Sequence, residues 1–306
     1  MLSDEKFYEK AQKFALLKNT ENKYYTLDEY KTLIESNQTD KDKNLIYIYA
    51  TDRIAQYNYI EMAQAKGYDV LLMDGQLDIH FIGLLEQKLE KSRFVRVDSD
   101  IVENLVKKED KGTTVLTSEE REMMTTVFKS QIPAIEKADF LVMFEPIGEK
   151  AQPVIITQNE FMRRMKDMSA MQPGMNFYGE LPDSFNLIVN TEHPLSKKII
   201  EDTENACKAE IEPIQGEIKT LQESVEKLRE NHKGKKDDEI PVPEKEDIKT
   251  KESKITELKK KEEDLLSTYA KSNNLVRQLV DLALLSNNML KGEALSQFVK
   301  RSVELL

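Results

Sequence analysis

The sequence predicts an α+β fold in two units, a small three-layer unit and then a mixed helix-and-sheet unit with an inserted antiparallel coiled-coil hairpin. Three observations predict it. A buried strand, a helix and a second buried strand follow one another within residues 45–73, which favours parallel pairing and a right-handed crossover. Apolar residues recur at heptad spacing over residues 211–228. Two apolar helices close the chain.

The first unit opens with helical periodicity. We expect one helix over residues 4–17, capped by Ser3 or Asp4, because the apolar residues Phe7, Ala11, Phe14 and Leu17 share one side. Thr26 is expected to cap a second helix over residues 27–35. Together these predict a helical start to the three-layer unit.

The strand–helix–strand motif takes residues 45–50 and 69–73 as its strands. Its connecting helix is expected to begin at Thr51 or Asp52 and to stop at Gly67. The last helix and strand of this unit are expected at residues 78–89 and 94–97.

A polar run over residues 107–114 separates the two units, so we expect domains of about 1–110 and 111–306. The second unit is predicted to begin with a helix over residues 118–128 and to place another helix across a small sheet. Its three strands are expected at residues 140–144, 154–156 and 185–189. Its crossing helix is expected at residues 160–171.

The inserted hairpin is predicted for about residues 207–270. The first heptad run consists of Ile211, Ile214, Ile218, Leu221, Val225 and Leu228. The second run consists of Ile248, Ile255, Leu258 and Leu265. A polar, proline-containing break between the runs favours two antiparallel helices over a single continuous one.

The two closing helices, residues 275–284 and 295–306, have apolar residues on more than one side. Such helices are buried on more than one side, and the surface can come from a partner subunit or from their own domain. For the first case, the candidate interface residues are Val276, Leu279, Val280, Ala283, Leu284, Leu295, Phe298 and Val299. Both alternatives remain open from the residues alone.

A methionine-rich helix is the most distinctive chemical feature. Its apolar residues share about half a turn and are Phe161, Met162, Met165, Met168 and Met171. Methionine is flexible and polarisable, so such a surface adapts to many apolar partners. Two interpretations follow: an exposed binding surface flanked by Arg163, Arg164 and Lys166, or an ordinary core helix.

Composition excludes several functions. The net charge is −11 and the basic runs are followed by acids, which opposes nucleic-acid binding. Cys207 is the only cysteine, so no intrachain disulfide is available, as is typical of a reducing compartment. No apolar run is long enough to span a membrane. We therefore expect a cytoplasmic protein that binds neither nucleic acid nor membrane.

Catalytic and metal-binding patterns are not evident. His80, His193 and His232 lie far apart, and none has a second ligand at metal-site spacing. Asp74 and Gly75 follow a strand, where α/β sheets often bind ligands, so a small enzyme site there is an alternative. We assign no catalytic residue, no metal ligand and no cofactor to this chain.

Long phrases of the sequence resemble a known family. In the first unit these include residues 67–74 and 91–100; in the second they include residues 153–157, 162–165 and 189–195. They are similar to the end of the middle domain and to the C-terminal domain of HtpG, the bacterial ninety-kilodalton heat-shock chaperone family. The closing helices resemble that family's dimerisation element.

The resemblance implies a molecular chaperone that binds unfolded client proteins and forms a homodimer. It implies that the methionine helix contacts clients and that the closing helices of two chains form a four-helix bundle. The family's ATP and Mg²⁺ site lies in an N-terminal domain, so this chain is expected to be a fragment without ATPase activity and Met1 an internal residue. The hairpin falls outside the family's common pattern, and our hypothesis for it is contact with clients or a co-chaperone. A structural coiled-coil adapter with a methionine core is the alternative.

Overall fold

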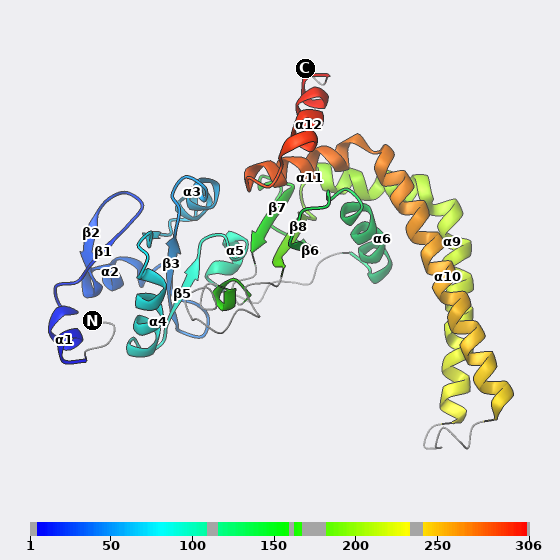
Figure 1. Ribbon diagram of the computed structural model, residues 1–306, viewed down its shortest axis with the longest axis horizontal. Helices are drawn as coiled ribbons and strands as arrows, with labels where there is room; N and C mark the ends of the chain where they lie inside the picture. Colours follow the sequence, from blue (N-terminus) through cyan, green and yellow to red (C-terminus); the bar gives the residue numbers. More distant parts are fainter. Residues whose placement is uncertain (1–4, 109–115, 159–161, 167–181, 233–240, 305–306) are drawn as a thin grey trace.

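The computed structural model describes residues 5–108, 116–158, 162–166, 182–232 and 241–304. The molecule is elongated, with a first unit at one end, a second unit in the middle and two long helices extending as an arm (Figure 1). The mixed α+β class predicted from the sequence is confirmed. Most of the predicted boundary segment lies outside the described residues.

The first unit alternates short helices and strands. In chain order they are α1 (Glu5–Ala11), β1 (Leu16–Lys18), β2 (Tyr24–Thr26), α2 (Leu27–Ile34), β3 (Leu45–Ala50), α3 (Tyr57–Ala65), β4 (Leu71–Leu72), α4 (Asp78–Lys88), β5 (Ser92–Arg96) and α5 (Val102–Leu105). A parallel sheet has the order β4-β3-β5, and β1 pairs with β2 in antiparallel fashion.

Strand β3 is buried along its whole length, because helices cover both faces of its sheet. Its alternate side chains enter two separate cores. Tyr47 and Tyr49 pack with residues of α2 and α4, while Ile46 and Ile48 pack with residues of α3 and α5. This alternation follows from the two-residue period of a strand.

The prediction of one helix over residues 4–17 is wrong beyond Ala11. The chain turns there and then forms β1, which buries Leu17 in the core. The Asn19 side chain fixes the turn into β2, since its Oδ1 accepts two backbone N–H bonds of 3.1 and 2.9 Å. A short strand next to a helix can satisfy helical spacing by chance, so periodicity did not distinguish the two.

The connecting helix α3 also begins later than predicted, at Tyr57. Asp52 does not cap it; the Asp52 carboxylate accepts backbone N–H bonds of 2.8 and 2.9 Å in the preceding turn. Gln56 closes this turn by accepting from the Thr51 N–H at 2.8 Å. Gly67 ends the helix region with a φ of +76°, as predicted for a glycine stop.

The second unit contains α6 (Ser118–Lys129), β6 (Ala138–Glu145), β7 (Val154–Gln158), β8 (Asp183–Asn190), α9 (Pro194–Asn231), α10 (Val242–Ser272), α11 (Asn274–Ser286) and α12 (Gly292–Glu304). Its sheet has the order β6-β8-β7, with β6 parallel and β7 antiparallel to β8.

This sheet is a middle layer that joins the two units. Val154 and Ile156 of β7 point into a core made with α6, α9, α10 and α11. Ile155, between them, points the other way and shares a core with Ile188 and with residues of α3 and α5. Both faces are therefore buried, one against the helices of the second unit and one against the first unit.

Helices α9 and α10 form the arm and run side by side in opposite directions (Figure 1). The first of them begins at Pro194, well before the predicted residue 207, and His193 Nδ1 caps it by accepting from the Leu195 N–H at 3.1 Å. Cross-helix pairs along the arm join Gln215 to Glu262 at 2.7 Å and Arg229 to Glu252 at 2.6 Å.

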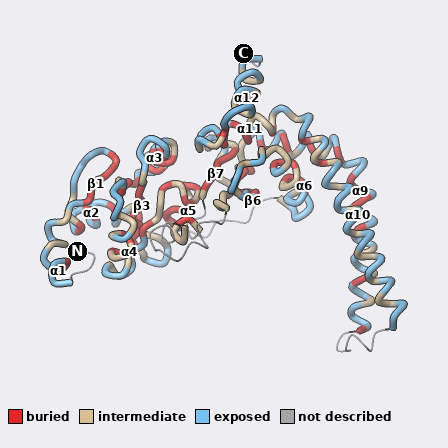
Figure 2. Tube along the Cα trace, viewed as in Figure 1, coloured by how far each residue is buried: buried red, intermediate tan, exposed pale blue. Residues whose placement is uncertain are grey.

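Burial is uneven between these parts (Figure 2). Buried residues concentrate in the two three-stranded sheets and in α11, while the arm buries one narrow strip that includes Ile211, Ile214, Ile218 and Val225. The arm therefore rests on contacts between its own two helices, as in a coiled coil.

Candidate functional site

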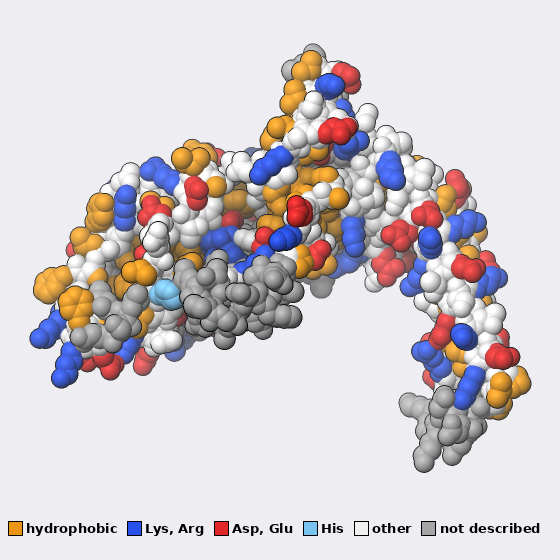
Figure 3. Space-filling model, in the orientation of Figure 1, with side chains coloured by type: hydrophobic (Ala, Val, Ile, Leu, Met, Phe, Trp, Pro, Cys, Tyr) orange, Lys and Arg blue, Asp and Glu red, His pale blue; other side chains and the backbone are white. Residues whose placement is uncertain are grey.

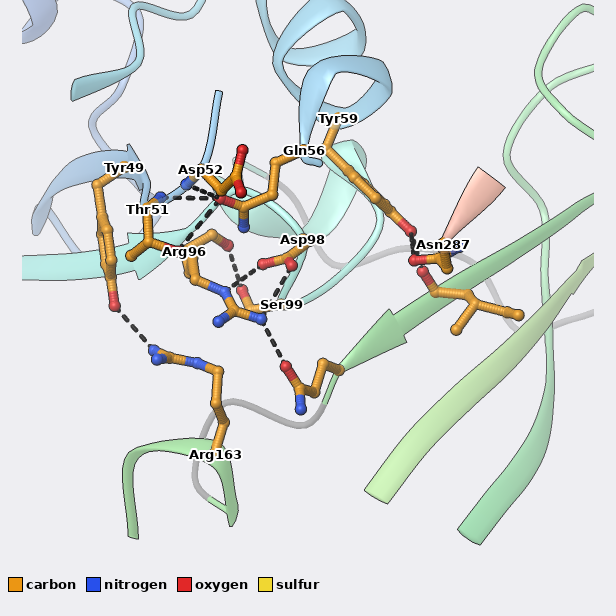
Figure 4. A network of polar contacts seen from close by, with 12 residues as sticks. Tyr49, Thr51, Asp52, Gln56, Tyr59, Arg96, Asp98, Ser99, Arg163 and Asn287 are labelled. Atoms are coloured by element: carbon orange, nitrogen blue, oxygen red, sulfur yellow. Dashed lines mark hydrogen bonds and ion pairs between the residues drawn. The ribbon is translucent and has the colours of Figure 1, made fainter. Parts of the chain in front are cut away.

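The helical residues 162–166 lie between β7 and β8 and carry part of the methionine-rich segment. Met162 and Met165 are half-buried, whereas Arg163 is only 6% exposed. The Arg163 guanidinium reaches into the first unit and donates a 2.8 Å hydrogen bond to the Tyr49 hydroxyl of β3 (Figure 4). Phe161, Met168 and Met171 lie outside the described residues.

Arg164 also reaches into the first unit. Its guanidinium lies 2.8 Å from a Glu86 carboxylate oxygen on α4, and it donates a further bond to the Phe94 carbonyl of β5. Glu86 in turn accepts from the Phe94 N–H at 2.9 Å. Lys166 pairs with Asp183 of its own unit at 2.8 Å. The three basic residues were expected to flank an exposed surface. In the structure, Arg163 and Arg164 bond to the first unit and Lys166 bonds to its own unit.

A polar network crosses the junction between the two units (Figure 4). Arg96, the last residue of β5, pairs with Asp98 and donates a 2.6 Å bond to the side chain of Gln158 in β7. The Gln158 N–H donates to the Asp98 carbonyl at 3.0 Å. The Arg96 guanidinium therefore has hydrogen-bond acceptors in both units, Asp98 in the first and Gln158 in the second, and a charge shielded from water requires such partners.

Tyr59 of α3 extends this junction to the C-terminal helices. Its hydroxyl contacts the Ile156 carbonyl and lies 2.7 Å from Asn287 Oδ1, in the turn between α11 and α12. Burial raises the pKa of Tyr59 well above its ordinary value, so the phenol stays protonated and donates.

The structure divides the candidate interface residues into two groups. Val276, Leu279, Val280, Ala283 and Leu284 of α11 are buried inside their own chain, packed against the sheet and its helices. Phe298 of α12 belongs to the same core. Packing onto their own domain, the second alternative from the sequence, therefore describes these six residues.

Other apolar residues of the two helices remain at the surface, namely Leu282, Leu285, Val299 and Val303. Val299 is 50% exposed and Val303 is 64% exposed, whereas Leu295 is half-buried. Helix α12 projects from the body, and hydrophobic side chains gather along it (Figures 1 and 3). Within the described chain, α11 is the one element that shares a substantial contact with it.

Polar pairs attach α12 to α11. Arg301 pairs with Asp281, and Gln278 donates to the Ser302 hydroxyl at 3.0 Å. Asp281 is 4% exposed, and burial raises its pKa although the nearby Arg301 opposes the shift. The buried pair gives α12 a fixed direction relative to α11, because moving either partner would leave a charge without its counter-ion.

The other sequence candidates lie in a turn and in the core. Asp74 and Gly75 are exposed, and the Asp78 carboxylate accepts from the Gly75 N–H at 2.9 Å, which makes this segment the turn into α4. Cys207 is buried, and burial raises the pKa of its thiol. Among the described residues, no cluster of potential ligands fits a metal ion, and no helix could cross a membrane.

Several residues of this region were not singled out from the sequence, among them Tyr59, Glu86, Arg96 and Asn287. Each meets partners far away in the chain, such as Tyr59 and Asn287, which are 228 positions apart. Local spacing carries no information on such pairs.

Comparison with known proteins adds the family. The "Chaperone protein htpG" of Bacteroides fragilis (strain YCH46) is 55% identical to this chain over 306 residues. The protein of the same name from Bacteroides thetaiotaomicron is 54% identical over 306 residues. The one from Porphyromonas gingivalis (strain ATCC 33277) is 48% identical over 309 residues. The match covers 100% of this chain and 45% of each relative, so the chain spans somewhat less than half of their length. No family model matches. With this identity over all of its residues, the chain belongs to the HtpG chaperone family.

Proposed function

We propose that this chain is the part of a chaperone that pairs with a second copy through α11 and α12 and binds unfolded client proteins through the methionine-rich helix. The observation that carries the proposal is the projecting helix α12, whose exposed valines have no cover in the described chain. Kinship with HtpG chaperones supports it.

Dimerisation is proposed through Leu282, Leu285, Val299 and Val303, because these are the apolar residues that α11 and α12 leave at the surface. A helix that touches the rest of its chain mainly through one neighbour gains by packing against a second copy. The six buried residues named above act indirectly: five hold α11 against the sheet, and Phe298 holds α12 to the same core.

Client binding is proposed for Met162 and Met165, together with the neighbouring Phe161, Met168 and Met171. The flexible thioether side chains suit varied apolar segments, as the unfolded parts of many proteins present. ATP and Mg²⁺ are proposed to act in a further part of the whole protein, with no binding residue in this chain. We further propose that the whole protein works in the cytoplasm.

The dimer is tested by sedimentation velocity over a concentration series. The paired change Val299→Glu and Val303→Glu should convert a dimer into a monomer, since burying unpaired carboxylates is costly. Val242→Glu, at a 67% exposed valine far out on the arm, is the matched control and should stay dimeric. A wild-type chain that is monomeric at every concentration contradicts the interface.

Client binding is tested separately, with reduced and carboxymethylated lactalbumin as an unfolded probe. Met162→Ser with Met165→Ser should lose most of the binding and keep the circular-dichroism spectrum of the wild type. If this double variant unfolds the chain instead, the methionines are core, and the structural-adapter alternative is favoured.

The arm formed by α9 and α10 is proposed to contact clients or a co-chaperone, because its length carries it well away from the body (Figure 1). Deleting residues 209–266 removes the outer arm and leaves the sheet. Client-aggregation assays should then show reduced suppression. Unchanged suppression would rule out an arm contact with clients.

A further inference from the structure

The helical residues 162–166 belong by chain order to the second unit, yet their two arginines bind the first. Arg163 contacts β3 through the Tyr49 hydroxyl, 114 positions earlier in the chain. Arg164 contacts α4 through Glu86 and β5 through the Phe94 carbonyl. Three elements of the first unit therefore hold one short helical segment.

The arginines and the methionines occupy opposite sides of this segment. At about 100° per residue, Met162 and Met165 lie within roughly 60° of each other, and Arg163 and Arg164 are centred roughly half a turn away. Burial agrees with this division, since Arg163 is 6% exposed and both methionines are half-buried. Docking of the arginine side directs the methionine side away from the first unit.

The contact of Arg164 with the first unit has a defined geometry. Arg164 and Glu86 make a close pair in which both side chains are mostly shielded, with side-chain exposures of 29% and 27%. Glu86 is itself fixed by the Phe94 N–H at 2.9 Å. A guanidinium held by two acceptors in a partly buried site has a defined orientation, which a single lysine-type contact would not give.

We propose that Arg163 and Arg164 are positioning residues, which orient the client-binding methionines by docking their helix onto Tyr49 and Glu86 of the first unit. The inference rests on the proposed client-binding role of this helix. It makes client affinity depend on two residues of the first unit that do not themselves belong to the methionine surface.

The test changes the first-unit side of the dock and leaves the helix sequence intact. Tyr49→Phe removes one hydroxyl, and Glu86→Gln removes the charge while keeping the shape. Tyr30→Phe is the matched control, because the Tyr30 hydroxyl donates its 2.9 Å bond to Asp69, which belongs to the first unit. Binding of the carboxymethylated lactalbumin probe and hydrogen exchange of residues 162–166 are measured for each full chain.

Tyr49→Phe combined with Glu86→Gln should weaken probe binding about ten-fold, which corresponds to about 1.4 kcal/mol. Exchange at residues 162–166 should accelerate, while the Tyr30→Phe control keeps wild-type values for both. Probe binding equal to wild type in the double variant would overturn the positioning role. A wild-type chain that fails to bind the probe would instead overturn the client-binding proposal, so the two failures are distinct.

Discussion

The hydroxyl of Tyr59 lies 2.7 Å from Oδ1 of Asn287, which joins α3 of the first unit to the turn between α11 and α12. Asn287 is held at its other end too, because its Nδ2 donates to the Ala283 carbonyl at 2.9 Å. Because the Nδ2 of Asn287 is occupied by the Ala283 carbonyl, the Oδ1 of the same side chain faces the Tyr59 hydroxyl. The turn that sets the direction of α12 is thereby tied to the first unit.

Removing this hydroxyl should destabilise the junction. Tyr59→Phe keeps the ring and removes the single hydroxyl proton that Asn287 Oδ1 and the Ile156 carbonyl share. The free energy of unfolding should fall by about 1 to 3 kcal/mol, the usual cost of unsatisfied buried polar groups. Urea denaturation measures it, and Tyr57→Phe, at a tyrosine that is 57% exposed, should change nothing. Equal midpoints for both variants would show that the contact is not stabilising.

The two capping boxes make a second prediction. Thr26 and Thr117 each accept from the backbone N–H three residues later, and Glu29 and Glu120 complete the reciprocal bonds. Thr26→Ala or Thr117→Ala should lower stability by about 1 kcal/mol. Thr→Ser at either position retains the hydroxyl and should retain most of that stability, as thermal unfolding can show. Equal losses for Ala and Ser would point to a lost methyl contact instead.

These caps also show which features the sequence could reveal. Thr26, Gly67 and the heptad run from Ile211 are local patterns, and each corresponds to an observed cap, helix end or buried strip. Local patterns arise from backbone geometry within a few residues, which is why spacing predicts them.

The remaining features depend on contacts between distant residues. Helical spacing showed that Leu279 and Val280 share an apolar face, but it could not show that the sheet covers that face, because strands β7 and β8 come from a different part of the chain. Likewise, Arg163 and Arg164 resemble a solvated flank in the sequence, and only the fold brings Tyr49 and Glu86 to them.

Glycine 216 of the arm gives a third prediction. Gly216 lies inside α9, and a Cβ built there meets nothing within 4 Å. Gly216→Ala should therefore stabilise the arm by up to about 1 kcal/mol, because alanine restricts the unfolded chain and favours helix. Gly292→Ala is the contrasting control, since its φ of +59° strains any residue with a Cβ and should lower stability. Hydrogen exchange along α9 measures the effect of Gly216→Ala on the arm, and slower exchange is expected. Faster exchange in this variant would contradict the prediction.

The buried pair of Asp281 and Arg301 gives a prediction about pH. Burial raises the pKa of Asp281 above its ordinary 3.8, with Arg301 acting in the opposite direction. The folded chain therefore keeps a proton on Asp281 at pH values where the unfolded chain has already lost it. By linkage, the stability from this proton is fully present below pH 3.8 and is lost as the pH rises through the folded pKa.

Asp281→Asn removes this titration while keeping the side-chain shape and an oxygen that can accept from Arg301. Above pH 3.8, the free energy of unfolding of the variant should thus decline less with rising pH, or rise more, than that of the wild type. Asp74→Asn makes the same change in charge at an exposed site and should give a curve parallel to the wild type. Urea titrations at a series of pH values measure all three curves. A curve for Asp281→Asn that runs parallel to the wild type would mean that Arg301 fully offsets the effect of burial on the pKa of Asp281, so that the folded chain holds no excess proton there and the prediction is wrong.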